Sequence, residues 1–378
     1  MFNKQDKRKN GYMLNGSLAK KGYGRWRYSF IGKSEKTGEE KPFFIEYFIC
    51  NPSSGDTYPI FGQLKENKEK KARPSYLMIK AGCYGKNACQ INRFFGIRSV
   101  SIHGRSPFSV SASDCILSER ELRGSVRVTR EEAAEHPEHM SDAGFMEWEL
   151  TINKRVAFNM GFCTGRLICA LKAFEMNWHA DGMRTLYAGN ITLNGERFTV
   201  TREGSFGYTD NIWGRGFSNP WIWLSSCCMT SRLSGRMLHH SVFDICGGKP
   251  KFFFLPLGRK LNGALFYEGT EFEFNFFKLL KHTKTEFEAY EKDSEIVWHI
   301  RQENRKAVML TDVTCQKRDM LLLNYESPYG EKRHTRLWNG GTGKGRIQLF
   351  RKGKSGPMLI DDISAENVGC TYGEYDKE

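Results

Sequence analysis

Short alternating segments separated by turn signals are the feature that most limits what this chain can fold into. Between residues 25 and 31, aromatic side chains at every second position alternate with polar ones, which is the period-two pattern of a β-strand. The run from Phe43 to Cys50 is apolar on both faces apart from Glu46, as expected for a strand buried on both sides. Similar runs recur at residues 75–81, 96–102, 146–152, 189–193, 197–201, 221–227, 241–246, 263–267, 271–277, 286–290, 295–302, 306–314, 320–325 and 345–351.

Turn and helix signals complete this pattern. Asn194-Gly195 lies between two strand patterns and predicts a two-residue hairpin. Thr129 and Glu132 have capping-box spacing, which predicts a short helix to about residue 135. Residues 162–176 place apolar side chains on one helical stripe and predict a helix over the end of a barrel. Many short strands with few helices predict an all-β sandwich or barrel architecture.

The length of 378 residues suits two domains, since domains usually have roughly 100–200 residues. We place the N-terminal β-domain at residues 1–200 and the C-terminal one at residues 201–378. The formal net charge of +14 is spread along the chain, without zinc-finger spacing, an RNP-type strand or a recognition-helix pattern. We therefore expect no nucleic-acid partner; attraction to an anionic ligand or surface agrees better with this charge.

The cysteines and the hydropathy pattern bear on the compartment. The 11 cysteines are scattered without C-x-x-C pairs, the N-terminus has no apolar signal segment, and no apolar run reaches the length of a membrane span. These features predict reduced thiols and a cytoplasmic protein. Peripheral contact with a membrane stays open, and the sequence does not indicate an oligomeric state.

Motifs for phosphate and metal binding are incomplete. A phosphate-binding loop would need a glycine five positions before Gly353, and that position is Gln348. His136 with His139, and the pair His239-His240, lack further ligands at metal-site spacing. We therefore expect no metal and no cofactor.

The most informative stretch is residues 188–229. It contains the hairpin, a Gly-rich crossing with Asp210, and then a strand that carries Trp221 and Trp223 on one face. One interpretation is that these indoles line a ligand pocket beside an acid. The alternative is that they simply fill a barrel.

This stretch resembles the central signature of the tocopherol cyclase family, in which Gly-Glu-Arg leads to Gly-Tyr, an acid–lysine pair, Trp-Gly, Phe and Pro/Ala-Trp-x-Trp. The opening strand at 22–30 and residues 240–248 also lie in the expected order. The matching residues are Gly195, Glu196, Arg197, Gly207, Tyr208, Asp210, Trp213, Gly214, Phe217, Pro220, Trp221 and Trp223. Two positions depart from the pattern: Asn211 replaces the lysine, and Arg27 replaces a tyrosine. The resemblance therefore does not imply a mechanism that requires this lysine. It also does not imply that the chain acts on the substrate of the plant members of the family.

The resemblance implies two tandem lipocalin-like β-barrel or β-sandwich domains that bind a hydrophobic, isoprenoid or polyene-like molecule. It further implies cyclisation or hydration of a double bond without a cofactor, the activity of an isomerase or a lyase. Such chemistry needs an acid that keeps its proton near neutral pH, which burial provides, and aromatic faces that stabilise a carbocation. The competing interpretation is a non-catalytic carrier of one hydrophobic ligand.

Three carboxyl groups are candidates for the acid. Asp210 occupies the family's acid position, Glu46 is a lone carboxyl in an apolar strand, and Asp244 lies in the apolar run 241–246. The alternative for each is a structural carboxylate paired with a basic side chain. The predicted substrate-binding residues are Trp26, Tyr28, Tyr208, Trp213, Trp221 and Trp223, each of which has core packing as its alternative role.

Overall fold

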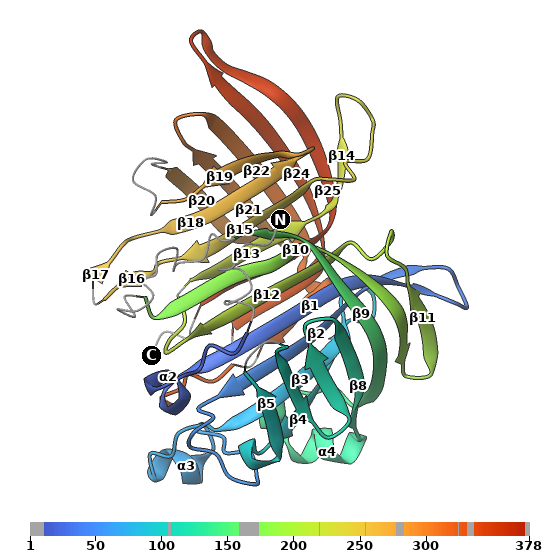
Figure 1. Ribbon diagram of the computed structural model, residues 1–378, viewed down its shortest axis with the longest axis vertical. Coiled ribbons are helices and arrows are strands. Elements are labelled where there is room, and N and C mark those ends of the chain that lie inside the picture. The colour runs from blue at the N-terminus through green and yellow to red at the C-terminus, as the bar shows by residue number, and fades with distance from the viewer. Residues whose placement is uncertain are drawn as a thin grey trace.

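The computed structural model describes residues 11–104, 107–158, 174–218, 220–253, 255–276, 283–323, 325–330 and 336–374. In these ranges the chain is mostly β-structure, arranged as two large antiparallel sheets that lie one above the other in Figure 1. The expected class, two tandem lipocalin-like β-domains of barrel or sandwich type with a few short helices, is confirmed. None of the described helices is long and apolar enough to cross a membrane.

The first sheet has 12 strands, and β1 (Tyr23–Ser34) lies near its middle. Its hydrogen-bonded order is β4-β3-β2-β1-β11-β10-β9-β8-β7-β6-β5, and β12 pairs with both β1 and β10. The other strands are β2 (Glu40–Cys50), β3 (Tyr76–Cys83), β4 (Cys89–Phe95), β5 (Val100–His103), β6 (Ser109–Ala112), β7 (Cys115–Ser118), β8 (Glu121–Val128), β9 (Gly144–Phe158), β10 (Met176–Leu193), β11 (Glu196–Val200) and β12 (Gly207–Gly214).

The second sheet has 11 strands in the order β19-β18-β15-β13-β25-β24-β22-β21-β20, with β14 on β25 and β23 on β24. Its strands are β13 (Trp221–Ser226), β14 (Cys228–Ser231), β15 (Val242–Gly248), β18 (Lys260–Tyr267), β19 (Thr270–Phe274), β20 (Lys284–Lys292), β21 (Glu295–Glu303), β22 (Ala307–Gln316), β23 (Leu321–Leu323), β24 (Arg336–Gly353) and β25 (Gly356–Glu374). A separate ribbon joins β16 (Lys251–Phe252) and β17 (Leu255–Pro256).

The described helices are all short. They are α2 (Ser17–Lys20), α3 (Lys65–Glu69), α4 (Arg130–Glu135) and the single 3₁₀ turns η1 (Ile97–Ser99), η2 (Pro137–His139) and η4 (Lys317–Asp319). The predicted capping box of α4 is present, with both reciprocal hydrogen bonds between Thr129 and Glu132. The helix predicted at residues 162–176 lies mostly outside the described residues, and its end enters β10.

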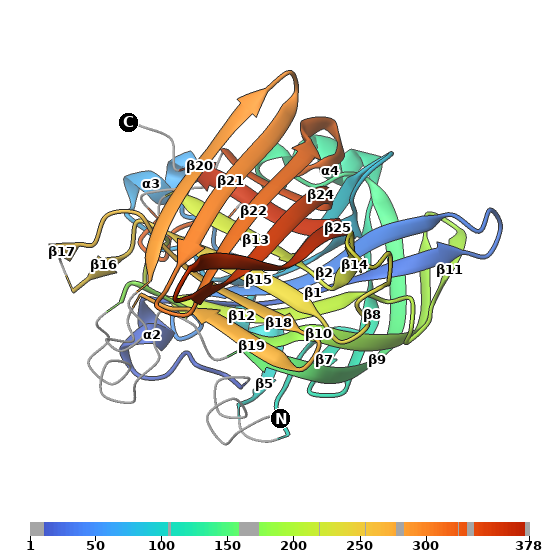
Figure 2. The same ribbon diagram turned by 90° about the horizontal axis from the view of Figure 1, so that it is seen from above.

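Three apolar clusters form the core, and one of them joins the two sheets. The first core packs on one face of the first sheet, and the third core packs on one face of the second sheet. Figure 2 shows the two sheets from above. The second core, called here the interface core, combines residues of β1, β2, β3, β10 and β12 with residues of β13, β15, β18, β23 and β24. The two sheets therefore meet through their outer faces, and strands such as β1 are buried on both sides.

Most predicted strands are present, and two predictions are corrected. Residues 207–214, expected as a Gly-rich crossing, form β12, in which every residue is buried. Residues 96–102, expected as one strand, divide into η1 and β5. The hairpin at Asn194-Gly195 is confirmed, because both residues have positive φ angles, 49° and 87°, as a type I′ turn requires. The domain boundary after residue 200 stays a prediction; the chain passes from one sheet to the other between Gly214 and Trp221.

Candidate active site

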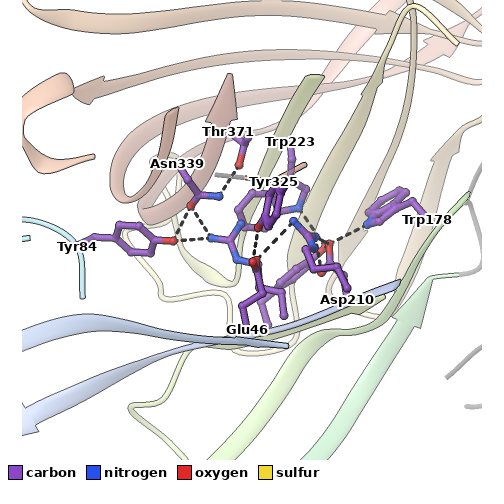
Figure 3. A network of polar contacts seen from close by, with 11 residues as sticks. Glu46, Tyr84, Trp178, Asp210, Trp223, Tyr325, Asn339 and Thr371 are labelled. Atoms are coloured by element: carbon purple, nitrogen blue, oxygen red, sulfur yellow. Dashed lines mark hydrogen bonds and ion pairs between the residues drawn. The ribbon is translucent and has the colours of Figure 1, made fainter. Parts of the chain in front are cut away.

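A buried polar network lies between the two sheets, on the outer face of strands β2, β1 and β12 (Figure 3). The register places the backbone of Arg27 opposite Glu46 on one neighbouring strand and opposite Asp210 on the other. Because side chains alternate along a strand, Arg25 emerges on this same face, one pleat away. The three neighbouring strands thus bring two guanidinium and two carboxyl groups together.

Arg25 and Asp210 form the centre of the network. One guanidinium nitrogen of Arg25 lies 2.8 Å from both carboxylate oxygens of Asp210, and another lies 3.8 Å from Glu46. Arg25 is 7% exposed and Asp210 is 1% exposed. Burial alone lowers the pKa of Arg25, but Asp210, then Tyr325 and Glu46, raise it above its ordinary value. Arg25 is therefore a permanent buried cation.

Asp210 accepts two more hydrogen bonds. The indole nitrogen of Trp178 donates to it at 3.1 Å, and the Tyr208 hydroxyl donates at 3.3 Å. Asp210 thus accepts hydrogen bonds from three side chains of the network, Arg25, Trp178 and Tyr208. For Asp210, the sequence left open a structural ion pair with a basic side chain as the alternative to an acid role. The contact between Asp210 and Arg25 is such an ion pair.

Residues of the C-terminal half of the chain complete the network. The Tyr325 hydroxyl donates a short hydrogen bond to Glu46, and the Trp223 indole nitrogen donates to the Tyr208 hydroxyl at 3.0 Å. The guanidinium of Arg27 lies 4.4 Å from the centre of the Trp223 ring. The site therefore exists only where the two sheets meet.

Arg27 also connects to an uncharged part of the network. It donates to the Tyr84 hydroxyl at 3.0 Å and to the side-chain oxygen of Asn339 at 2.7 Å. Tyr84 donates to the same oxygen at 2.6 Å, and the Asn339 amide donates to Thr371 at 2.8 Å. These contacts position one end of the guanidinium without neutralising its charge.

Asp244 is the carboxyl group whose environment differs most from that of Asp210. It is fully buried on β15, and neither of its oxygens has a hydrogen bond of good geometry to the described residues. Burial and then the charge of Asp210 raise the pKa of Asp244 well above its ordinary value, and the nearby donors Tyr208 and Trp223 lower it by less. Asp244 therefore keeps its proton to a higher pH than an exposed aspartate does.

Tyr208 joins the two carboxyl groups. Burial, followed by the charges of Asp210 and Asp244, raises the pKa of Tyr208 well above its ordinary value. Its hydroxyl group therefore stays protonated at neutral pH, donates to Asp210 and influences Asp244. Tyr208 therefore donates to Asp210 and lies close enough to Asp244 to influence its pKa.

Two pockets flank this network. The Arg27 pocket, lined by Arg27, Tyr84, Tyr208, Trp223 and Ser225 among others, holds about 420 Å³ of empty space that includes some open solvent. The Arg25 pocket holds about 360 Å³ on the same definition, and its lining includes Tyr23, Arg25, Phe48, Phe217, Trp221 and Tyr325. The cavity volume itself is only about 30 Å³ in the Arg27 pocket and about 20 Å³ in the Arg25 pocket, which is room for one or two water molecules. An organic ligand therefore fits at either place only if the lining side chains move.

The predicted site residues divide between two places. Glu46, Tyr208, Asp210, Trp221, Trp223 and Asp244 lie in or beside the network at the interface. Trp26, Tyr28 and Trp213 belong to the first core, on the opposite face of β1 and β12. The structure does not bring these three to the other candidates. Side chains alternate along a strand, and these three point to the opposite face of the sheet.

Several network residues were not foreseen from the sequence. Arg25 and Arg27 matched the polar face of an amphipathic strand, yet both are buried. The signal that points to them is the pair Glu46 and Asp210, since buried carboxylates require buried partners. Trp178, Tyr84, Tyr325 and Asn339 carry no comparable signal in their local sequence.

No protein-family model and no curated protein sequence matches this chain. Several solved structures align over most of its length, among them the following three. Kievitone hydratase from Nectria haematococca is 12% identical, with a TM-score of 0.49 over 96% of this chain and 93% of that one. A Nitrosomonas europaea protein described as AttH is 11% identical, with a TM-score of 0.48 over 100% and 96%. CghA, solved with Sch210972, is 10% identical, with a TM-score of 0.47 over 95% and 90%. At these identities and scores, none of the three supports a statement about this chain's chemistry.

Proposed function

We propose that the chain binds a hydrophobic small molecule between its two sheets and catalyses acid–base addition at a double bond, either hydration or ring closure. The observation that carries this proposal is the buried Asp244 carboxyl with a raised pKa beside the Tyr208 hydroxyl, which donates to Asp210. A hydratase or cyclase needs such a pair of groups with separated protonation states. The tocopherol cyclase-like activity and the isoprenoid or polyene-like substrate belong to this proposal.

In the proposed reaction, Tyr208 gives its proton to one carbon of the double bond and takes the proton of Asp244. Water, or a hydroxyl group of the substrate, then bonds to the other carbon and loses its proton to Asp210. Transfer of that proton back through Tyr208 to Asp244 restores the starting state. The balance is one water added, or one ring closed, with no net change in the protein.

Arg27 limits which substrates suit this site. Its guanidinium covers one face of the Trp223 indole at 4.4 Å, so that face is not free to stabilise a carbocation, in contrast to what we expected from the aromatic residues. A fixed positive charge instead stabilises negative charge that develops on oxygen. We therefore favour substrates whose double bond is conjugated to a carbonyl or phenol oxygen that Arg27 contacts.

The test is deuterium uptake from heavy water. A prenylated quinol and an unsaturated phenolic ketone are incubated with the protein in D₂O, and the products are analysed by mass spectrometry and NMR. We expect deuterium at one carbon of the former double bond. Asp244→Asn should lower the rate by about 10²–10⁴-fold. The control is Asp361→Asn, which alters a buried carboxyl that accepts from Ser231 instead.

Two outcomes contradict the proposal. Full activity in Asp244→Asn removes the assigned acid. Tight binding of these compounds without any exchange identifies a carrier, the competing interpretation of the same pocket.

A further inference from the structure

A second cluster of ligand-type side chains lies on the first sheet, outside the interface network. His136, Glu138 and His139 offer one ligand atom each, and these three atoms lie within 4.8 Å of one another. We propose that they form a binding site for a divalent transition metal, with Zn²⁺ as the ion that suits this set best. These three residues lie outside the tocopherol cyclase-like signature at residues 188–229, and the proposed reaction does not use them.

The distances between the ligand atoms fit a metal centre. Nδ1 of His136 lies 3.1 Å from Oε1 of Glu138, and Nε2 of His139 lies 3.9 Å from the same oxygen. In a tetrahedral zinc site with bonds of about 2.0–2.1 Å, neighbouring ligand atoms lie about 3.3 Å apart. The observed distances lie on either side of this value, so small side-chain rotations are sufficient.

The backbone of this segment is fixed on both sides. Upstream, α4 ends at Glu135, and the backbone nitrogen of the following residue, His136, donates to the Glu132 carbonyl at 3.1 Å. Downstream, the buried Asn92 side chain on β4 donates to the carbonyls of His139 and Met140, at 3.1 and 2.9 Å. Ligands held in this way lose little conformational freedom when a metal binds.

The His139 ring is positioned as well. It packs against Phe61 and Phe94, with ring centres 4.9 and 4.6 Å away. The His136 ring stacks on it at 4.9 Å with an angle of 18° between the planes. These rings limit the rotation of His139, which is the usual task of the groups behind a metal ligand.

The type of ion follows from the ligand set. Two imidazole nitrogens and one carboxylate suit zinc and other borderline transition metals better than Mg²⁺ or Ca²⁺, which prefer oxygen ligands. The His136 side chain is 50% exposed, so solvent reaches the cluster. Three protein ligands leave at least one coordination position for water or another small ligand.

The experiment titrates the metal-free full-length protein with Co²⁺, a spectroscopic substitute for Zn²⁺, and follows the visible bands. We expect one saturable site without the near-ultraviolet band of cobalt–thiolate bonds. His136→Ala and His139→Ala should each weaken binding by at least tenfold, and Glu138→Gln should weaken it too. Zn²⁺ should displace the cobalt and raise the Tm of the wild type.

The matched control is the double variant His239→Ala/His240→Ala, which also removes two histidines. It should bind cobalt like the wild type. The inference is wrong if the wild type binds no cobalt, if a thiolate band accompanies binding, or if His136→Ala binds unchanged. Because the substitutions lie in the connection between β8 and β9 and not within a strand, circular dichroism should show the wild-type fold in each variant.

Discussion

The two faces of β1 show how differently one strand can be used. Toward the first core it presents Trp26, Tyr28 and Phe30, which pack among apolar neighbours. Toward the interface it presents Arg25 and Arg27, which are equally buried but engage carboxylates, tyrosines and an asparagine. Burial alone therefore does not distinguish a core from a site. The difference is whether the buried groups carry charge and have long-range partners.

We expect the largest effect on stability from removal of the buried cation Arg25. Arg25→Met leaves Asp210 and Glu46 buried without their shared partner, which should lower the free energy of unfolding by about 3–5 kcal/mol. Urea denaturation measures it. Arg25→Met/Asp210→Asn should recover at least about 1 kcal/mol of this loss, since one unpaired charge is gone. A cost below about 1 kcal/mol for Arg25→Met, typical of exposed pairs, would mean that the interface is solvated.

The second prediction concerns pH and Asp244. Its pKa is raised in the folded state, so as pH rises above about 4 the unfolded chain loses this proton first and the wild type loses stability. Asp244→Asn lacks that loss. The stability of the variant relative to the wild type should thus increase by about 1.4 kcal/mol per pH unit, until the folded pKa is reached. Denaturation curves at several pH values measure this difference. Parallel stability–pH curves would show that Asp244 titrates normally and would remove the proposed acid.

The third prediction uses two tryptophans, one from each face. Trp223→Phe removes a donor and part of the ring from the interface, whereas Trp26→Phe makes the same change in the first core. We expect Trp223→Phe to weaken binding of an apolar fluorophore such as Nile red by about tenfold, equivalent to about 1.4 kcal/mol. Trp26→Phe should leave that Kd unchanged. Equal effects of both variants would place the ligand inside the first sheet instead.

The smallest expected effect comes from two threonines. Thr371 accepts a hydrogen bond from the Asn339 amide at 2.8 Å, so Thr371→Val should cost about 1–2 kcal/mol by leaving that donor unsatisfied. Thr311 is fully buried, and its hydroxyl has no partner among the described residues. Thr311→Val should therefore be neutral or slightly stabilising. Thermal denaturation of both variants measures the difference, and the opposite order would contradict the distinction between site and core.

Local patterns in the sequence predicted the strands better than the site. β1, β2, β13 and β15 follow from aromatic and apolar runs, and the Asn194-Gly195 turn follows from its two small residues. β12 was missed because its glycines and the polar run from Thr209 to Asn211 lower its apparent strand propensity. In the structure these polar groups are bonded within the sheet and the network, so tertiary contacts overrule propensity.

The site was predicted only in part because its partners are distant in sequence. Arg25 and Asp210 are 185 residues apart, and Glu46 and Tyr325 are 279 apart. The period-two pattern of a strand shows which residues share a face. It does not show which face carries the site when both faces are buried, as they are in β1. For that reason Trp26 and Tyr28 seemed as suitable as Trp221 and Trp223.

The order of the charged groups along the chain has a consequence for synthesis. Arg25, Glu46 and Asp210 all belong to the first sheet, and a ribosome delivers that sheet before any strand of the second. The emerging half can therefore neutralise its own charges on the face that it later buries. The second half then contributes uncharged partners, chiefly Trp223, Tyr325 and Asn339. Docking therefore buries Arg25, Asp210 and Glu46 as a set that is already paired, whereas Arg27 meets its uncharged partner Asn339 only at that step.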